Sequence, residues 1–334
     1  MSDAVPSSPV NKLATGITSF DVIAKGGLPV HRTTLVSGTA GSGKTVFAMQ
    51  FLAEGIRNYG ENGVFVTFEE SAADIRKNMS SFGWDLAKWE AEGKLLFVDA
   101  SPDPEIESVE VGGFDLGALL ARVQNAIRKV NAQRVSVDSL GAVFTQFSDQ
   151  STIRRELFRI AWALKRSNVT ALLTAERTED YGPVARFGIE EFIADNVMIL
   201  RNVLDAENRR RTIEILKFRG TDHQKGEYPF TIIAGKGFVV IPLSAIELRQ
   251  KSSNIRISSG NAELDQMCGG GFFRDSVILL SGATGTGKTL MVTQFLAGGA
   301  AAGERCLLLA FEESREQLFR NAHGWGVDFE TMER

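Results

Sequence analysis

Apolar runs short enough for β-strands alternate with longer amphipathic segments along the first part of the chain. The runs that predict strands are residues 32–37, 63–68, 133–139 and 170–175, and the segments that predict helices are residues 46–52 and 153–166. Uninterrupted apolar strands that alternate with helices are typical of a parallel sheet covered on both faces. The pattern therefore predicts an α/β fold with a doubly wound, mostly parallel sheet.

A glycine-rich segment follows the first expected strand, and a second copy of it lies later in the chain. The first copy, with the residue after it, is Gly38, Thr39, Ala40, Gly41, Ser42, Gly43, Lys44, Thr45 and Val46. The second is Gly282, Ala283, Thr284, Gly285, Thr286, Gly287, Lys288, Thr289 and Leu290. Both match the pattern G-x-x-x-x-G-K-[ST] of phosphate-binding loops. A chance glycine-rich turn is the less favoured alternative, because a strand precedes the first copy, a helix follows it and the segment recurs.

The residue types in these loops fit the binding of a nucleoside triphosphate. Glycines allow several backbone N–H groups to point at one phosphate chain, and the helix that begins there directs its positive end at the same anion. Lys44 supplies a positive charge for the β- and γ-phosphates, and Thr45 supplies a hydroxyl ligand for Mg²⁺. The sequence therefore predicts ATP and Mg²⁺ as ligands, with Lys288 and Thr289 in the same positions of the second loop.

The residues around the two loops also repeat at a nearly constant spacing. The matched pairs are Gly16 and Gly260, Asp21 and Asp265, Gly27 and Gly271, Asn78 and Asn321, and Gly83 and Gly326. This long period indicates a duplicated domain and not a short-period solenoid. We expect a disordered tail at residues 1–10, a complete domain at residues 11–247, and the start of an incomplete second domain at residues 248–334 of a longer protein.

Two glutamates directly follow the second expected strand, and the same pair recurs in the second copy. They are Glu69 and Glu70 in the first copy and Glu312 and Glu313 in the second. Ligands bind at the carboxyl ends of strands in open α/β sheets, and carboxylates in a buried sheet are costly unless they contact a charge, water or a metal. We therefore predict that these glutamates orient and deprotonate the water that attacks the γ-phosphate. The alternative is a solvated strand end with two surface acids.

Asp138 closes the apolar strand expected at residues 133–139, as in a Walker B strand. In that position its carboxylate would hold the Mg²⁺ shell through Thr45 or through a water molecule. The candidate metal ligands are thus Thr45, Asp138, Thr289 and Glu312. Glu176 follows the next expected strand, and two roles stay open for it: sensing the γ-phosphate, or only ending the strand.

Basic residues surround a glycine turn late in the first domain. They are Lys217, Arg219, His223 and Lys225, on either side of Gly220. Side chains at alternate strand positions share one face. The segment is predicted to be either a solvated basic hairpin or a set of fingers that reach the triphosphate of a neighbouring subunit.

Composition narrows the class of function. The chain has 334 residues, of which 43% are hydrophobic and 23% are charged, and its net charge is −4. An acidic balance gives no general case for binding nucleic acid or a membrane. No apolar run reaches the roughly 18 residues of a membrane span. Cys268 and Cys306 lack metal-ligand spacing, which predicts reduced thiols in a cytoplasmic protein.

Several motifs together resemble the KaiC family of circadian clock proteins. They lie at residues 69–70, 82–86, 111–116, 179–183, 217–221, 226–230 and, in the second copy, 267–273. The resemblance runs from residue 11 to residue 334, and it implies a RecA-like P-loop fold and a homohexameric double ring with ATP at each subunit boundary. It also implies an ATPase in the first domain. In the intact second domain it implies a serine/threonine autokinase and autophosphatase, whose acceptor residues lie beyond Arg334.

The resemblance assigns roles to individual residues. It implies that Glu69 and Glu70 are the catalytic acids, that Glu312 with Glu313 takes this role in the second copy, and that Ser81 lies near the base. Trp325 is implied to lie near adenine in the second copy. The residues implied to contact the nucleotide across the subunit boundary are Lys217, Phe218, Arg219, Thr221 and His223.

Some positions depart from the family pattern. Phe218 stands where leucine is usual, and Ile233 with Ala234 replaces a polar pair near the ribose or base. A KaiB-like partner is implied for the half that contains residues 111–116, and a KaiA-like partner for a C-terminal part beyond Arg334.

Two alternatives from other classes stay open. A DNA-dependent ATPase of the RecA recombinase or helicase class would need basic, aromatic loops in its channel, and the negative net charge argues against it. ATP hydrolysis that single-stranded DNA leaves unchanged would discriminate against this class. A KaiC homologue that works in signalling without a clock is the other alternative.

The second copy is expected to contain apolar strands at residues 277–281 and 306–311 with a helix between them. It holds no counterpart of the Asp138 strand or of the basic hairpin. Because a parallel sheet needs its neighbouring strands, we expect this segment to be weakly ordered, to bind ATP poorly and to lack autokinase activity.

Overall fold

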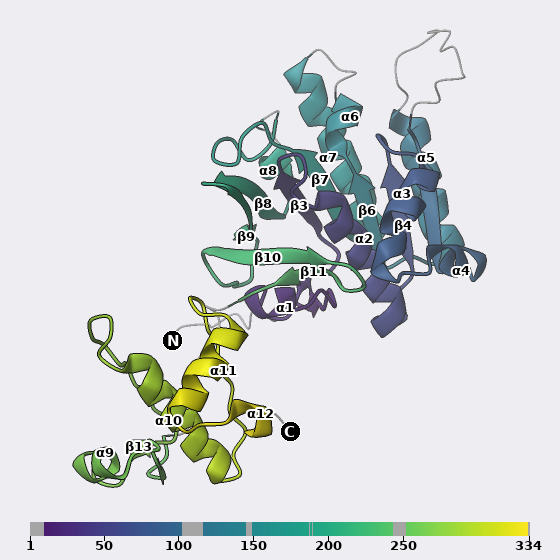
Figure 1. Ribbon diagram of the computed structural model, residues 1–334. Helices are drawn as coiled ribbons and strands as arrows, with labels where there is room; N and C mark the ends of the chain where they lie inside the picture. The colour runs from purple at the N-terminus through teal and green to yellow at the C-terminus, as the bar shows by residue number, and fades with distance from the viewer. Residues whose placement is uncertain are drawn as a thin grey trace, which may run out of the picture. The chain divides into compact units, whose positions relative to one another are not determined.

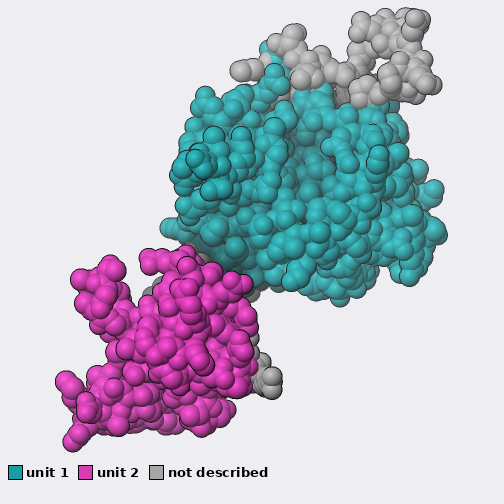
Figure 2. Space-filling model, in the orientation of Figure 1, with its two compact units in different colours: residues 1–247 teal, residues 248–334 magenta. Residues whose placement is uncertain are grey.

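The computed structural model describes residues 10–101, 116–144, 149–186, 188, 190–242 and 252–332. The chain forms two compact units, Met1–Glu247 and Leu248–Arg334 (Figure 1, Figure 2). Almost all of the tail predicted at residues 1–10 lies outside the described residues, as does most of the motif at residues 111–116. Within the described ranges, no helix has both the length and the apolar character needed to span a membrane.

A nine-stranded sheet forms the centre of the first unit (Figure 1). Its strands, in spatial order, are β11 (Gly237–Val240), β10 (Glu227–Ile233), β9 (Asn208–Phe218), β8 (Asn196–Asp205), β3 (Thr33–Gly38), β7 (Thr170–Glu176), β6 (Arg134–Asp138), β4 (Gly63–Thr67) and β5 (Leu95–Asp99). From β8 to β5 all neighbours are parallel, whereas β9, β10 and β11 extend one edge as antiparallel strands. The predicted doubly wound, mostly parallel sheet is confirmed. Its antiparallel edge is not predicted by the apolar pattern.

Helices cover both faces of this sheet, and each face has its own apolar core. One core takes residues from α1 (Phe20–Ile23), α2 (Lys44–Glu54), α3 (Ala72–Met79) and α4 (Leu86–Ala91), and the other from α5 (Leu116–Val130), α6 (Leu140–Phe144), α7 (Gln150–Arg166) and α8 (Glu190–Ile193). Adjacent residues of a strand point to opposite faces, so Val36 of β3 belongs to the first core and Leu35 to the second. The central strand is therefore buried on both sides.

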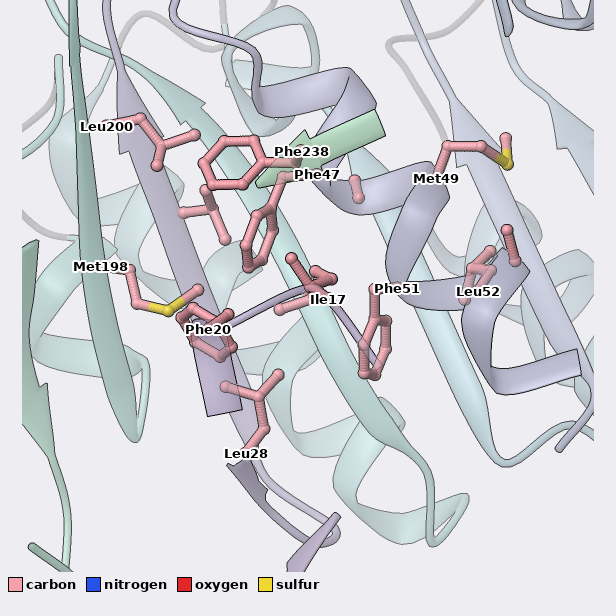
Figure 3. Packing of buried hydrophobic residues seen from close by; sticks show 14 of the residues in the cluster. Ile17, Phe20, Leu28, Phe47, Met49, Phe51, Leu52, Met198, Leu200 and Phe238 are labelled. Carbon is pink, nitrogen blue, oxygen red and sulfur yellow. The ribbon is translucent and has the colours of Figure 1, made fainter. Parts of the chain in front are cut away.

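The first core fixes the helix that follows the phosphate loop. Phe47 of α2 packs edge-on against Phe20 and Phe238, with ring centroids 5.3 Å and 5.1 Å apart (Figure 3). Edge-on aromatic pairs add to the free energy of apolar burial. The helix is longer than the predicted residues 46–52: it begins at Lys44 and continues as a π-helix, Gly55–Tyr59.

Arg134, the first residue of β6, has a fully buried side chain. Its guanidinium pairs with Glu61 and donates to the carbonyl oxygens of Ala14 at 2.7 Å and Phe51 at 2.8 Å. Burial lowers the pKa of Arg134, and the Glu61 carboxylate opposes that effect. A buried charge of this kind is tolerated only because it is paired and hydrogen-bonded. Arg134 thus joins the N-terminal segment and α2 to the centre of the sheet.

We expect the substitution Arg134→Met to lower the free energy of unfolding by about 3 kcal/mol, because it leaves Glu61 and several buried carbonyl oxygens without a partner. Equilibrium unfolding in urea, followed by a spectroscopic signal from the first unit, measures this free energy. Arg128→Met on the exposed side of α5 is the matched control, with an expected change within about 0.5 kcal/mol. Equal effects of the two substitutions would contradict the role given to Arg134.

The second unit has fewer strands than its sequence predicts. Its elements are β12 (Arg256–Ile257), α9 (Ala262–Met267), β13 (Phe272–Phe273), α10 (Lys288–Ala301), α11 (Arg315–Gly324) and α12 (Phe329–Met332). The prediction of strands at residues 277–281 and 306–311 is wrong: neither segment is paired in a sheet, and Val277 and Phe311 are 97% and 95% exposed.

The topology of the first unit gives the physical reason. The corresponding strands β3 and β4 do not pair with each other; β3 pairs with β7 and β8, and β4 with β5 and β6. The 334 residues contain no second copy of these four partners. An apolar run without a neighbouring strand has no ladder of hydrogen bonds to join.

The segment before each phosphate loop nevertheless has the same local geometry in both units. Asp21 accepts a hydrogen bond from the backbone N–H of Thr15 at 3.0 Å, and Asp265 accepts one from that of Ser259 at 2.7 Å. The strands β1 (Lys12–Leu13) and β2 (Leu28–Pro29) pair as β12 and β13 do. This shared local geometry is what the predicted duplication leads us to expect.

Candidate active site

The carboxyl ends of β3, β7, β6 and β4 meet at one edge of the first unit's sheet. A cavity of about 160 Å³ lies there, lined by Ala40, Gly41, Lys44, Thr45, Thr67, Glu69, Glu70, Asp138, Ser139 and Glu176. The phosphate loop, the glutamate pair and the aspartate strand thus converge on one place, although they lie far apart in the sequence. The cavity is strongly acidic, with four carboxylates and one ammonium group.

Lys44 begins α2 and folds back over the phosphate loop. Its Nζ donates to the carbonyl oxygens of Gly38 at 2.9 Å and Thr39 at 3.1 Å. Burial lowers the pKa of Lys44, while the carboxylates of the cavity oppose that effect. Gly43 precedes it at φ 91°, and a Cβ atom there would lie 2.8 Å from Ile232. The positive backbone angle therefore favours glycine at this position.

Thr45 and Asp138 form a pair of oxygen groups next to Lys44. The Thr45 hydroxyl donates to Asp138 Oδ2 at 2.6 Å, and the Thr174 hydroxyl donates to the other carboxylate oxygen. Burial raises the pKa of Asp138, and both hydroxyl donors oppose that effect. Among the described residues, no group of three His, Cys, Asp or Glu side chains is arranged around a metal. Mg²⁺ needs no such group, because it is held by one or two protein oxygens together with phosphate and water.

Glu69 and Glu70 lie just beyond β4, in the turn before α3. Glu69 accepts a hydrogen bond from the Ser139 hydroxyl, and Glu70 accepts one from Asn78 Nδ2 at 2.9 Å. Both glutamates are exposed, so the expectation of a buried-sheet setting for them is wrong. The strand ends at Thr67, which leaves the two carboxylates in contact with both the cavity and solvent. Each therefore stays hydrated while it faces the loop.

Three more residues line the cavity or contact a side chain that does. Ser139 is the residue that fixes Glu69, and Thr174 fixes Asp138 from the neighbouring strand β7. Glu176 ends β7 and lines the cavity near Lys44. The contacts of Ser139 and Thr174 follow from the strand order, in which β6 lies between β4 and β7, but strand order is not visible in the apolar pattern.

The basic residues around Gly220 (Lys217, Arg219, His223 and Lys225, called the basic set below) lie at the opposite end of the strands, where β3 and β8 begin. Phe218 pairs with Asn196 at the start of β8, level with Thr34 of β3, whereas the phosphate loop follows Gly38. None of the five residues implied to contact nucleotide across the subunit boundary lines the cavity: Lys217, Phe218, Arg219, Thr221 and His223. A strand rises about 3.3 Å per residue, so Thr34, and with it Phe218, lies about 13 Å before Gly38 along β3.

The members of the basic set have local partners instead. Lys217 Nζ donates to the carbonyl oxygen of Glu191 at 2.9 Å, and Arg219 Nη1 lies 3.5 Å from Asp195. Phe218 is buried, with the His223 ring edge-on against it at 5.4 Å.

A second hollow of about 540 Å³ is lined by Ser151, Arg154, Arg155, Phe158, Arg159, Ile193 and Arg219.

The residues implied to lie near the base are also outside the cavity. The carbonyl oxygen of Ser81 accepts from the backbone N–H of Gly235 at 2.9 Å. Ser81 therefore lies beside the turn that contains Ile233 and Ala234, on the same side as the start of α2. In the second unit, Trp325 follows α11 and is 41% exposed.

The second phosphate loop repeats the first in outline. Lys288 Nζ donates to the carbonyl oxygens of Gly282 at 2.7 Å and Ala283 at 2.8 Å. Thr289 Oγ1 lies 3.5 Å from Glu313, which also accepts from Asn321 as Glu70 does from Asn78. Glu312 is exposed and has no described contact with the loop. The structure therefore brings together Lys288, Thr289 and Glu313, but not Glu312 or Trp325.

The chain is similar to known proteins along most of its length. The family model described as "ATPase: KaiC" matches residues 13–245 and again residues 257–334. The chain is 66% identical over 325 residues to the circadian clock protein KaiC3 of a Synechocystis species. It is 60% identical over 325 residues to the circadian clock oscillator protein KaiC of Parathermosynechococcus lividus, and 59% identical over 325 residues to that of Synechococcus elongatus.

Each of these alignments covers 97% of the chain but 64%, 60% and 62% of the relatives. The chain thus spans about three fifths of the length of the curated relatives it matches. The two matches to the family model correspond to the two phosphate loops and their flanks. The chain belongs to the KaiC family of P-loop ATPases.

Proposed function

We propose that the chain is the ATP-binding and ATP-hydrolysing core of a KaiC-type circadian clock protein, with Mg·ATP bound at the first phosphate loop. One observation carries this proposal. Lys44, Thr45, Asp138 and Glu69 belong to three separate sequence segments, and the fold brings them to one cavity at the carboxyl edge of the sheet. These are the group types that binding a triphosphate, holding Mg²⁺ and activating water require.

Each residue has a defined task in this proposal. The backbone N–H groups of the loop and the ammonium group of Lys44 bind the β- and γ-phosphates. When phosphate binds, Lys44 donates to phosphate oxygens in place of the carbonyl oxygens of Gly38 and Thr39. The Thr45 hydroxyl would hold Mg²⁺, and Asp138 orients that hydroxyl through the 2.6 Å hydrogen bond. The bound ion would supply positive charge next to the phosphate oxygens. Glu69 and Glu70 orient the attacking water and accept its proton.

Ser139 and Glu176 support the same reaction. The Ser139 hydroxyl donates to Glu69 Oε1, which fixes the rotamer of that carboxylate and leaves its other oxygen for water. Glu176 lines the cavity next to Lys44. We assign it to sensing the γ-phosphate, because a change in phosphate charge alters its interaction with Lys44 directly.

The site is proposed to be completed by a neighbouring copy of the chain in a homohexamer. The supporting observation is that the basic set around Arg219 lies at the edge of the sheet opposite to the cavity, so it cannot reach the nucleotide of its own subunit. The hollow with Arg154, Arg155, Arg159 and Arg219 concentrates positive charge on that edge. Its sign is opposite to that of the acidic cavity edge, as two faces that meet in a ring require.

Further properties are proposed for the longer protein. They are serine/threonine autokinase and autophosphatase activity, a KaiB-like partner for the first unit, a KaiA-like partner for a part outside these residues, and a cytoplasmic location. The support is the family membership and the second phosphate loop with Glu313 next to Thr289. Within the second unit, Glu312 is the proposed general base.

We expect the chain to be monomeric without nucleotide and hexameric with saturating Mg·ATP, because bound triphosphate supplies the anion that the basic edge of the neighbour needs. Size-exclusion chromatography with light scattering measures this. Arg219→Ala should shift the equilibrium towards monomer, whereas Arg128→Ala on the exposed side of α5 should not. A wild-type chain that stays monomeric at saturating Mg·ATP and every protein concentration would exclude the shared site.

A further inference from the structure

The segment that follows β7 runs alongside the first phosphate loop. The backbone N–H of Arg177 donates to the carbonyl oxygen of Gly38 at 3.1 Å. Three residues later, Asp180 Oδ1 accepts a hydrogen bond from the Thr39 hydroxyl at 2.8 Å. The first two residues of the loop are therefore held from outside, by a backbone contact and by a side-chain contact. Neither Asp180 nor this segment lines the cavity.

Asp180 is itself held by a neighbouring strand. The same carboxylate oxygen accepts from the backbone N–H of Asn202 at 3.0 Å, and the carbonyl oxygen of Asp180 accepts from Arg201 Nε at 3.1 Å. Both residues belong to β8, and each residue is only 6% exposed. Arg201 is in turn paired with Glu214 of β9. Asp180 thus connects Thr39 to the rigid part of the sheet.

The segment around Asp180 is also braced internally. Arg177 Nη2 donates to the carbonyl oxygen of Gly182 at 2.8 Å, and its Nε donates to that of Pro183 at 3.0 Å. These bonds close the segment into a compact turn that starts directly after Glu176. The turn limits the movement of the Asp180 carboxylate. The hydrogen bond from Thr39 to that carboxylate therefore limits the movement of the phosphate loop.

We propose that Asp180 is a positioning residue for the first phosphate loop, acting through the hydroxyl of Thr39. The inference rests on the proposed binding of ATP at this loop. Backbone N–H groups bind phosphate best when they are oriented before the ligand arrives, because the loop then loses less conformational entropy on binding. Through Asp180, the hydroxyl of Thr39 is fixed to β8. This contact orients the next two residues of the loop, Ala40 and Gly41, which line the cavity.

The second phosphate loop cannot make this contact. Its corresponding residue is Ala283, which has no hydroxyl group. The two loops share the geometry of the lysine and of the glycine before it, with φ 91° at both Gly43 and Gly287. The hydrogen bond to Asp180 is therefore a property of the first loop alone, and removing the hydroxyl of Thr39 makes the first loop resemble the second at this position.

The test compares Thr39→Val, Asp180→Ala and the double variant in the full chain carrying Lys288→Ala, so that only the first loop binds. Binding of Mg·ADP by calorimetry and steady-state ATP hydrolysis are measured. Each single substitution should weaken binding and raise KM about tenfold, with kcat within about twofold, because a hydrogen bond to a charged group is lost away from the reacting atoms. The double variant should bind no more weakly than Asp180→Ala, because both substitutions remove one interaction.

Glu179→Ala is the matched control, since it removes the same charge from the preceding, exposed residue of the segment. It should change neither KM nor affinity by more than about twofold, which separates positioning from long-range electrostatics. Wild-type affinity in Thr39→Val and Asp180→Ala, or effects that add in the double variant, would overturn the inference. Failure of the Lys288→Ala chain itself to bind Mg·ADP would instead contradict the proposed function.

Discussion

Replacing Glu69 and Glu70 together by glutamine is expected to lower ATP turnover by about 10²- to 10⁴-fold while leaving Mg·ADP affinity within about threefold. The amides keep the shape of the side chains and their hydrogen bonds to Ser139 and Asn78, but they cannot accept a proton from water. Both glutamates are exposed, and Lys44 donates hydrogen bonds to the carbonyl oxygens of Gly38 and Thr39, so we expect binding of the phosphates to depend little on the glutamates.

Phosphate release under saturating Mg·ATP measures the rate, and calorimetry with Mg·ADP measures the affinity. The double substitution Glu92→Gln with Glu207→Gln is the control, because it removes the same charge at two positions outside the cavity. Turnover of the Glu69→Gln, Glu70→Gln chain at the wild-type rate would show that these residues are not the catalytic acids.

The second large effect concerns Lys44. We expect Lys44→Ala to weaken Mg·ADP binding at the first loop by at least about a hundredfold, because it removes the single cation from a cavity that retains four carboxylates. The measurement is calorimetry in the Lys288→Ala background. Lys88→Ala on the exposed side of α4 is the control and should bind as the background does. Retained affinity in Lys44→Ala would mean that the nucleotide binds elsewhere.

The elements around the first phosphate loop could be predicted because their signals are local. A buried parallel strand is apolar along its length, as β3 and β4 are, and the loop pattern marks the start of α2. The prediction of strands in the second unit was wrong for the opposite reason. Residues 277–281 and 306–311 have the same apolar character, but a strand also requires neighbours that local sequence does not reveal.

The same distinction applies to the site. Lys44, Thr45 and Asp138 belong to motifs with a known spacing, and the fold places them in contact. Thr174 and Asp180 carry no motif, and their contacts depend on which strands are adjacent and on how the segment after β7 turns. The exposure of Glu69 likewise depends on where β4 ends. The strand is buried up to its last residue, Thr67, whereas Glu69, two residues later, is exposed.

We propose that ATP is hydrolysed at the first phosphate loop. Its most direct test is phosphate release by the 334-residue chain with Mg·ATP, comparing wild type with Lys44→Ala and Lys288→Ala. We expect similar turnover for wild type and Lys288→Ala, and none above background for Lys44→Ala. Turnover that survives Lys44→Ala and disappears in Lys288→Ala would contradict it.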